Sequence, residues 1–185
     1  GTVGRYNRYN NDGNGMVYFR DLYGIALDQS DSTDEFMYAA NGTRQDGRGS
    51  FSGQRSYISK VCTGIAVTAA CPRMGELVAV HDTGGRSPAI DVQGNYVYVV
   101  NTSRRLFKLN KSNLSQVTFR NINTSINHIA PNQAGITAVG DYVYVASYNR
   151  NRICKFKTSD LSNANFGNGQ HCLSGGNVNR PIGLA

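Results

Sequence analysis

Three histidines are the side chains of this sequence whose type and spacing best suit chemistry. His81, His128 and His171 are separated by 47 and 43 residues. Three imidazoles that converge on one point can hold a zinc ion with an open fourth position, which is the arrangement that activates water. Histidines in the exposed loops of a repeated structure would show the same spacing. We expect the loop arrangement and keep the zinc site as the alternative.

An acidic segment over residues 28–35 (DQSDSTDE) offers a second candidate metal site. Its carboxylates recur at short intervals, and calcium takes oxygen ligands from such patterns. The segment lacks the glycine turn and the distal glutamate of an EF-hand loop. We therefore expect a solvated turn and no cofactor, with calcium, like zinc, as the alternative.

Signatures of nucleophilic and phosphate-transferring enzymes are absent from the sequence. It contains no Gly-x-Ser-x-Gly, no His-Glu-x-x-His and no P-loop motif. We assign no catalytic residue and expect a protein that is not an enzyme.

The four cysteines, Cys62, Cys71, Cys154 and Cys172, contain no Cys-x-x-Cys pair. Disulfides explain them better than a zinc ribbon or a thioredoxin-like site. Pairing of nearest neighbours would close two short loops, but four cysteines allow three connectivities and the sequence does not choose among them. Because disulfides persist in oxidising compartments, we expect a secreted, extracellular protein.

Asn-x-Ser/Thr sequons permit N-glycosylation in such a compartment. The five sequons begin at Asn41, Asn101, Asn110, Asn113 and Asn123. Most of them fall in the middle of the chain, so a glycoprotein would carry its glycans mainly there.

The elements that would position these residues repeat along the chain. Residues 96–101 (YVYVVN) and 142–147 (YVYVAS) nearly coincide and lie 46 positions apart. Each alternates aromatic and branched side chains, as a strand with two packed faces does. A shorter apolar strand and a glycine-containing hairpin turn precede each segment, and a third strand with a lysine follows.

A longer copy of this unit comes first, with strands expected over 23–28, 36–41 and 57–61. Its insertion over 42–56 is rich in Gly, Ser and Arg, which predicts an exposed loop. We treat residues 1–185 as one β-propeller domain or segment. The blade-like repeats are expected over 23–86, 87–133 and 134–180, with partial units over 1–22 and 181–185.

The fold class is expected to be all-β. No window of 11 or more residues shows apolar positions at helical spacing. Antiparallel units that repeat every 46 to 48 residues indicate propeller blades, which bury their faces by stacking on neighbours. A β-sandwich explains the short strands but not near-identical copies in register. We expect a β-propeller of about four blades. Its core is expected to contain Tyr98, Tyr144, Ile90, Ile136, Leu106 and Ile153.

The repeat resembles the NHL-repeat family of β-propellers. The clearest segment is 149–156 (NRNRICKF), and most of the chain from Gly13 onward shows the same order of strands and turns. The usual acidic residue after the second strand is replaced by Asn41, Asn101 and Ser147. The resemblance implies a propeller fold, and it says little about function because one fold serves many.

The resemblance has two implications for function. A metal-dependent propeller lyase resembles this chain at the NHL level, so the three histidines would form an axial site in a lyase-like enzyme. NHL propellers that bind RNA give a precedent for a basic face. The chain has 19 Lys and Arg against 12 Asp and Glu, a net charge of +7, and therefore attracts anions. The loops between second and third strands hold Arg44, Arg48, Arg55, Arg104, Arg105, Arg150 and Arg152.

Partners follow from these features. Anionic glycans or nucleic acid suit the basic face, although disulfides argue against nucleic acid. No segment approaches the roughly 20 consecutive apolar residues of a membrane helix, so we expect no membrane insertion.

Length adds a further expectation. Closed NHL-type propellers commonly have six blades, whereas 185 residues provide about four. We expect either a piece of a longer protein or a subunit completed by a neighbouring copy, with filaments where head-to-tail contacts do not close. The expected function is that of a non-catalytic extracellular structural or binding module that engages proteins or copies of itself.

Overall fold

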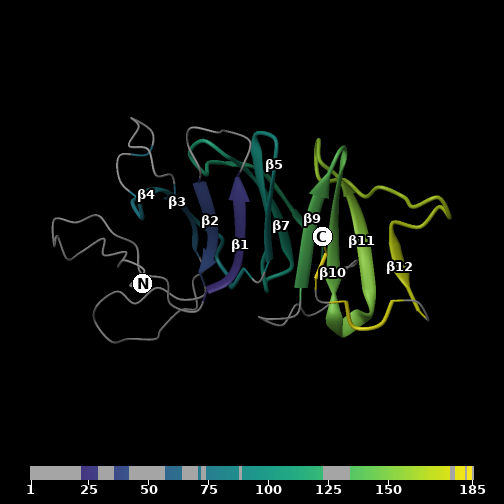
Figure 1. Cartoon of the computed structure of the whole chain (residues 1–185). Helices are drawn as coiled ribbons and strands as arrows, with labels where there is room; N and C mark the ends of the chain where they lie inside the picture. The colour runs from purple at the N-terminus through teal and green to yellow at the C-terminus, as the bar shows by residue number, and fades with distance from the viewer. Residues whose placement is uncertain are drawn as a thin grey trace.

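The computed structural model contains three antiparallel four-stranded β-sheets that follow one another along the chain (Figure 1). The structure describes residues 22–28, 36–41, 57–63, 71, 74–87, 89–122, 134–175, 178–181 and 183–184. The first sheet consists of β1 (Leu22–Asp28), β2 (Phe36–Asn41), β3 (Tyr57–Cys62) and β4 (Leu77–Asp82). The second consists of β5 (Ala89–Gln93), β6 (Tyr96–Val100), β7 (Arg105–Asn110) and β8 (Gln116–Asn121). The third consists of β9 (Ala134–Val139), β10 (Tyr142–Ser147), β11 (Arg152–Lys157) and β12 (Cys172–Ser174).

Each sheet is a meander in which sequential strands pair. Hairpins as tight as those between β5 and β6 and between β9 and β10 need a residue with positive φ, which Gly94 and Gly140 supply at 56° each. The short 3-10 helix Tyr148–Arg150 links β10 to β11. In the described part of the chain, no helix has the length and apolarity of a membrane span.

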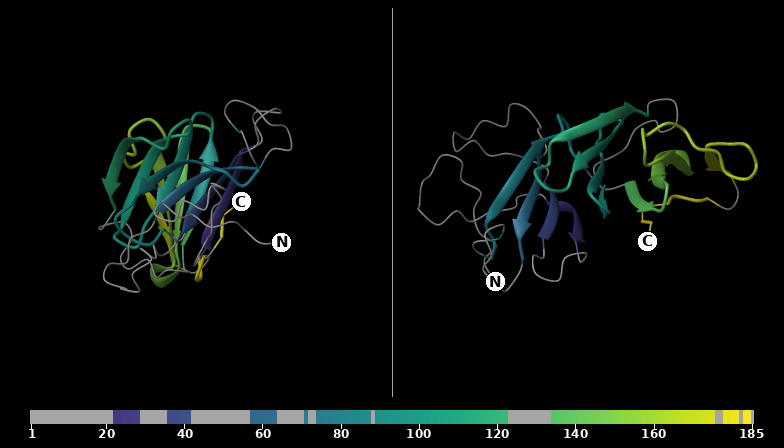
Figure 2. Two further views of the ribbon diagram at one scale, coloured as in Figure 1. Left: turned by 90° about the vertical axis from the view of Figure 1, so that its left-hand side faces the viewer. Right: turned by 90° about the horizontal axis from the view of Figure 1, so that it is seen from above.

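The three sheets fan out from their first strands (Figure 2). β1 contacts β5, and β5 contacts β9, so these first strands lie innermost. It follows that β4, β8 and β12 are the outermost strands. The sequence pattern did not identify these fourth strands, because their side chains are largely half-exposed and carry little apolar alternation.

Two apolar cores fill the spaces between the sheets. The core between the first and second sheets includes Ile58, Ile90 and Phe107. The core between the second and third sheets includes Leu106 and Ile136. The second sheet is therefore covered on both faces, as stacking of blades requires.

The expected core is correct for four of its six residues. Tyr98, Leu106, Ile90 and Ile136 are buried at 7% exposure or less. Tyr144 and Ile153 are only half-buried. They point away from the second sheet, and no further sheet covers them in the described part of the chain.

Candidate functional site at the joints between the sheets

A buried lysine joins the first sheet to the second. Lys60 on β3 is 6% exposed, and its Nζ donates a hydrogen bond to the backbone oxygen of Ser112 at 3.2 Å. The same ammonium lies 3.8 Å from the centre of the Phe36 ring, a favourable cation–π distance. A buried charge is costly unless it is bound, and this lysine is bound by the neighbouring sheet. We call this arrangement a lysine joint.

The second and third sheets repeat the lysine joint. Lys108 on β7 is 6% exposed, and its Nζ donates to the backbone oxygens of Thr158 at 2.8 Å and Ser159 at 3.2 Å. Its ammonium lies 3.9 Å from the centre of the Tyr96 ring. Burial lowers the pKa of Lys108, and the nearby Asp160 carboxylate partly opposes that effect.

The accepting carbonyls belong to two turns with one shape. Leu114 and Leu161 adopt positive φ of 58° and 60° and are buried, at 1% and 0% exposure. Such backbone is unfavourable for leucine, so their burial in the core must hold it. In each turn a side-chain oxygen, of Asn113 or Asp160, accepts the backbone N–H two residues later at 2.9 Å. The similar runs KSNLS and KTSDLS were the sequence signal for these turns, and sequence analysis missed it.

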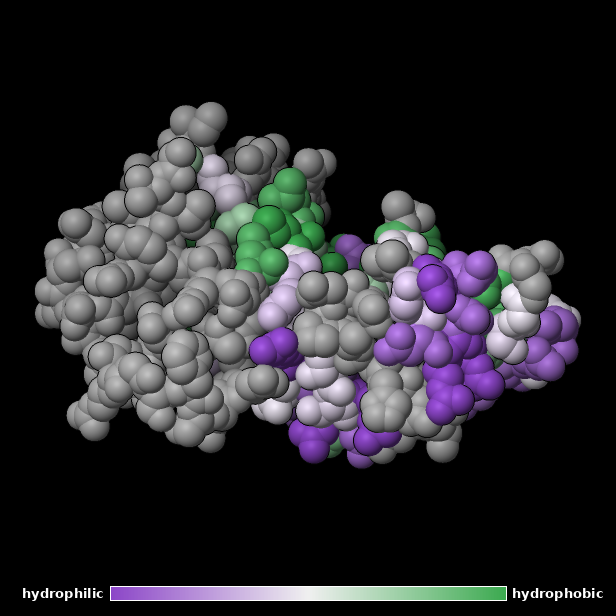
Figure 3. Space-filling view, turned by 90° about the horizontal axis from the view of Figure 1, so that it is seen from below, coloured by the Kyte–Doolittle hydropathy of each residue, from purple (hydrophilic) through white to green (hydrophobic). Residues whose placement is uncertain are grey.

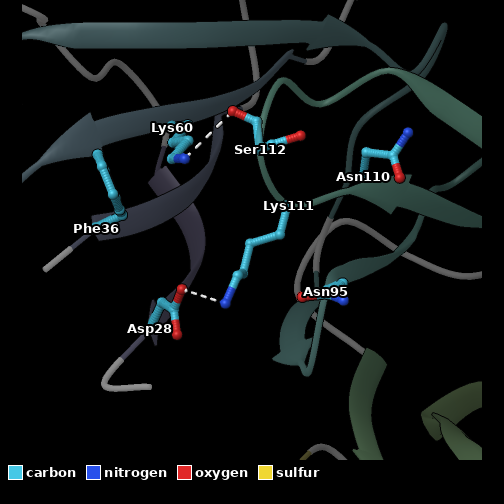
Figure 4. A pocket seen from close by; sticks show the side chains of 7 residues that line it. All are labelled: Asp28, Phe36, Lys60, Asn95, Asn110, Lys111 and Ser112. Carbon is cyan, nitrogen blue, oxygen red and sulfur yellow. Dashed lines mark hydrogen bonds and ion pairs between the residues drawn. The ribbon is translucent and has the colours of Figure 1, made fainter. Parts of the chain in front are cut away.

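A cavity of about 300 Å³ opens at the first joint (Figure 4). Across it, the Lys111 Nζ forms an ion pair with Asp28 Oδ2 at 2.9 Å. The Tyr38 hydroxyl donates to the backbone oxygen of Lys111 at 3.1 Å, and burial raises the Tyr38 pKa. The lining consists of Asp28, Phe36, Lys60, Asn95, Asn110, Lys111 and Ser112. Its charges are engaged with one another across the two sheets, so the cavity belongs to the joint.

In the described part of the chain, the third sheet carries the lysine of a joint without a sheet beyond it. Lys155 on β11 places its ammonium 3.7 Å from the centre of the Tyr142 ring. The rings of Tyr144 and Phe166 lie at 5.9 Å and 5.7 Å from the same atom. Among the described residues, its Nζ donates one long hydrogen bond of 3.4 Å, to the backbone oxygen of Asn165 in its own sheet region.

The structure places the two histidines that it describes at outer strands of their sheets. His81 lies on β4 of the first sheet, and His171 directly precedes β12 of the third. Both positions are at the outer strands, because spacing along the repeat does not fix the distance from the axis. The His81 ring packs edge-on against Phe107 at 6.0 Å, and burial lowers its pKa. His128 lies outside the described residues.

The acidic segment does not present its first residue to a cation. Asp28 is buried and paired with Lys111, so it serves the first joint, and residues 29–35 lie outside the described part. Among the described residues, no group of three His, Cys, Asp or Glu is placed to hold a metal ion.

The cysteines form two disulfides, Cys62–Cys71 and Cys154–Cys172, which pair nearest neighbours. The second bridge joins directly paired residues of β11 and β12. It therefore fastens the short outermost strand of the third sheet to the strand inside it.

The sequons differ in their accessibility. Asn101 is unsuitable for a glycan, since it is fully buried and its amide donates to the Thr83 backbone oxygen at 2.8 Å. Asn110 is half-buried and donates to Ser115 Oγ at 2.7 Å, whereas Asn113 is exposed. The Asn41 side chain and Asn123 lie outside the described residues.

Four of the seven arginines that were expected on a basic face lie at one end of the stacked sheets. Gln93 donates to the Gly140 backbone oxygen at 3.2 Å, so the β5–β6 and β9–β10 turns share one end. The β6–β7 and β10–β11 turns therefore share the opposite end, which we call the arginine end. It holds Arg104, Arg105, Arg150 and Arg152, whereas Arg44, Arg48 and Arg55 lie outside the described residues. Hydrophilic side chains cover this end of the third sheet in Figure 3.

The stacked sheets are similar to those of known structures. BamB from Moraxella catarrhalis aligns with 76% of this chain at 15% identity and a TM-score of 0.51. Apo AztD from Citrobacter koseri aligns with 90% at 8% identity and a TM-score of 0.51. Both are β-propeller-like, and so is this fold; the chain spans 35% and 49% of their lengths. No family model and no curated protein matches the sequence.

Proposed function

We propose that the chain is a non-catalytic, extracellular structural or binding module with an NHL-like propeller fold. The observation that carries this proposal is the third lysine, Lys155. Lys155 occupies the position from which Lys60 and Lys108 bind the next sheet. In the described part of the chain, no sheet covers the face of the third sheet that carries it. A face of aromatic rings around one ammonium suits a protein partner that supplies backbone carbonyls and apolar side chains.

The use of the reactive side chains supports a structural role. Lys60 and Lys108 bind carbonyls of a neighbouring sheet, and His81 packs against Phe107. The two disulfides support an extracellular setting, because such bridges persist in oxidising compartments.

Site-specific photo-crosslinking tests the binding role. A photoreactive amino acid replaces Tyr144 on the open face, in cells that secrete the protein, and Val117 on β8 serves as the exposed control position. We expect an adduct with an identified protein from position 144 only, and its loss when Lys155→Ala is added. Absence of a protein adduct at position 144 would contradict the proposal.

Binding of an anionic glycan is a second candidate function. The observation in its favour is the arginine end, where two residues of adjacent sheets are exposed: Arg105, which begins β7, and Arg150, which ends the 3-10 helix before β11. Sulfated chains are long enough to contact several guanidinium groups at once, and arginine suits such bidentate contacts.

A further inference from the structure

The two joints inside the chain define two complementary surfaces. The lysine half consists of the aromatic, branched and lysine side chains of one sheet, such as Tyr96, Leu106 and Lys108. The lysine half of one sheet packs against a facing surface of the next sheet. That facing surface includes an isoleucine of the first strand of its own sheet. That residue is Ile90 in the second sheet and Ile136 in the third, and both are buried, at 7% and 6% exposure. We call this surface the isoleucine half.

Both halves also occur at the ends of the stack, where no described sheet covers them. The third sheet ends in a lysine half made of Tyr142, Ile153 and Lys155. The register of the strands places Ile25 in the first sheet where Ile90 lies in the second, since they pair with Ala39 and Val99. Ile25 is nevertheless 50% exposed, and Leu27 on the same face is 57% exposed.

From this complementarity we infer that the open lysine half of one copy docks onto the first sheet of a second copy. This inference rests on the proposed binding role of the Lys155 face and names its partner. The apolar part of the contact continues an arrangement that the chain already makes twice, with Ile25 in the place of Ile90 and Ile136. It also covers the large apolar side chains that the ends expose, including Val139, which is 59% exposed on the outer face of β9.

The docking is head-to-tail, because two different surfaces meet. In the described part of the chain, the fan of three sheets in Figure 2 does not close into a ring, so two copies can each close the other. Contacts that do not close would extend into a longer assembly. Either arrangement uses the same interface.

Sedimentation velocity over a concentration series of the purified full chain tests the inference. We expect reversible association of the unmodified chain. Lys155→Ala should weaken it at least tenfold, because the substitution removes the cation and the long side chain at the centre of the lysine half. Ile25→Asp should do the same from the other side. Arg105→Ala is the control, since Arg105 is an exposed basic residue of β7 in the second sheet, which lies between the two end sheets.

Mixing the two defective variants tests the direction of docking. One copy with Lys155→Ala and one with Ile25→Asp still possess one intact half each, so a one-to-one complex should form between them. No complex in the mixture would overturn the head-to-tail arrangement. Circular dichroism melts confirm that the variants are folded, which is expected because both positions are at open surfaces.

The outcomes separate this inference from the proposed function. A chain that stays monomeric up to millimolar concentration overturns the inference. If photo-crosslinking at position 144 still identifies another protein, the binding role stands and the partner is that protein. If crosslinking at position 144 also finds no protein, both the inference and the proposed binding role fail.

Discussion

The second and third sheets have nearly the same strand sequences but different surroundings. Tyr98 is 1% exposed, whereas its counterpart Tyr144 is half-buried. Lys108 binds two carbonyls of the next sheet, and Lys155 binds one in its own. Burial of a side chain in this stacked fold is therefore determined by the neighbouring sheet and not by the sequence of the repeat.

The largest difference in unfolding free energy between the two sheets should come from truncating the apolar residue two positions before each lysine. Leu106→Ala removes a fully buried side chain between two sheets and should lower the free energy of unfolding by about 2–5 kcal/mol. Ile153→Ala should cost about half as much, because Ile153 is partly solvated. Urea unfolding of the monomeric chain measures both. Equal losses would show that the third sheet is covered as fully as the second.

Replacing the lysines should also lower the unfolding free energy more in the second sheet than in the third, but by a smaller difference. Lys108→Met leaves the Thr158 and Ser159 carbonyls without their ammonium and should cost about 1–3 kcal/mol. Lys155→Met should cost less than about 0.5 kcal/mol in monomeric protein, as for other exposed contacts. Urea unfolding at low protein concentration provides the measurement. A large loss for Lys155→Met would mean that its own sheet depends on it.

Alkaline pH should destabilise the folded chain through the buried Tyr98 of the second sheet. Burial, with a smaller effect of Tyr96, raises the pKa of Tyr98 to about 12. The folded protein therefore holds this proton more tightly than the unfolded chain, whose tyrosine pKa is about 10. The stability that this group contributes is complete below pH about 10 and is lost as the pH rises towards 12. Tyr98→Phe should flatten the decline of the unfolding free energy, measured by urea unfolding, over this range.

The smallest effect is expected at the arginine end. The Arg105 guanidinium lies 5.4 Å from the centre of the Phe119 ring, so it is less free to meet a ligand than the exposed Arg150. If this end binds anionic glycans, Arg150→Ala should lower the salt concentration that elutes the protein from immobilised heparin. Arg105→Ala should lower it less. Unchanged elution of both variants would remove the glycan hypothesis.

The strands were predictable because local chemistry determines them. Alternation in residues such as Val97 and Tyr98, and glycine at position 94, specify a strand and a turn within one short window. The joints were not predictable in this way. Lys108 and Lys155 occupy equivalent positions of the repeat. Lys108 is bound by a turn 50 residues further along the chain, whereas no equivalent turn lies beyond the third sheet in the described part of the chain.

The histidines show what the spacing of a repeat does not determine. A regular spacing of His81 and His171 suggested a common point, but spacing along a repeat does not say which strand of a blade carries the residue. The fourth strands that hold or adjoin them have a weak apolar pattern, so their presence was not recognised. An outer strand places a side chain far from the axis.

The outermost strands of the last two sheets are fastened by different means at the same register. In the second sheet Phe107 faces Phe119, with ring centres 5.9 Å apart, and in the third sheet Cys154 is bonded to Cys172. Under a pulling force, rings separate but a disulfide does not. With sequence separations of 9 and 18 residues, the two disulfides hide roughly 90 Å of contour length at about 3.4 Å per residue. An assembly of such chains would therefore stretch less when oxidised than when reduced.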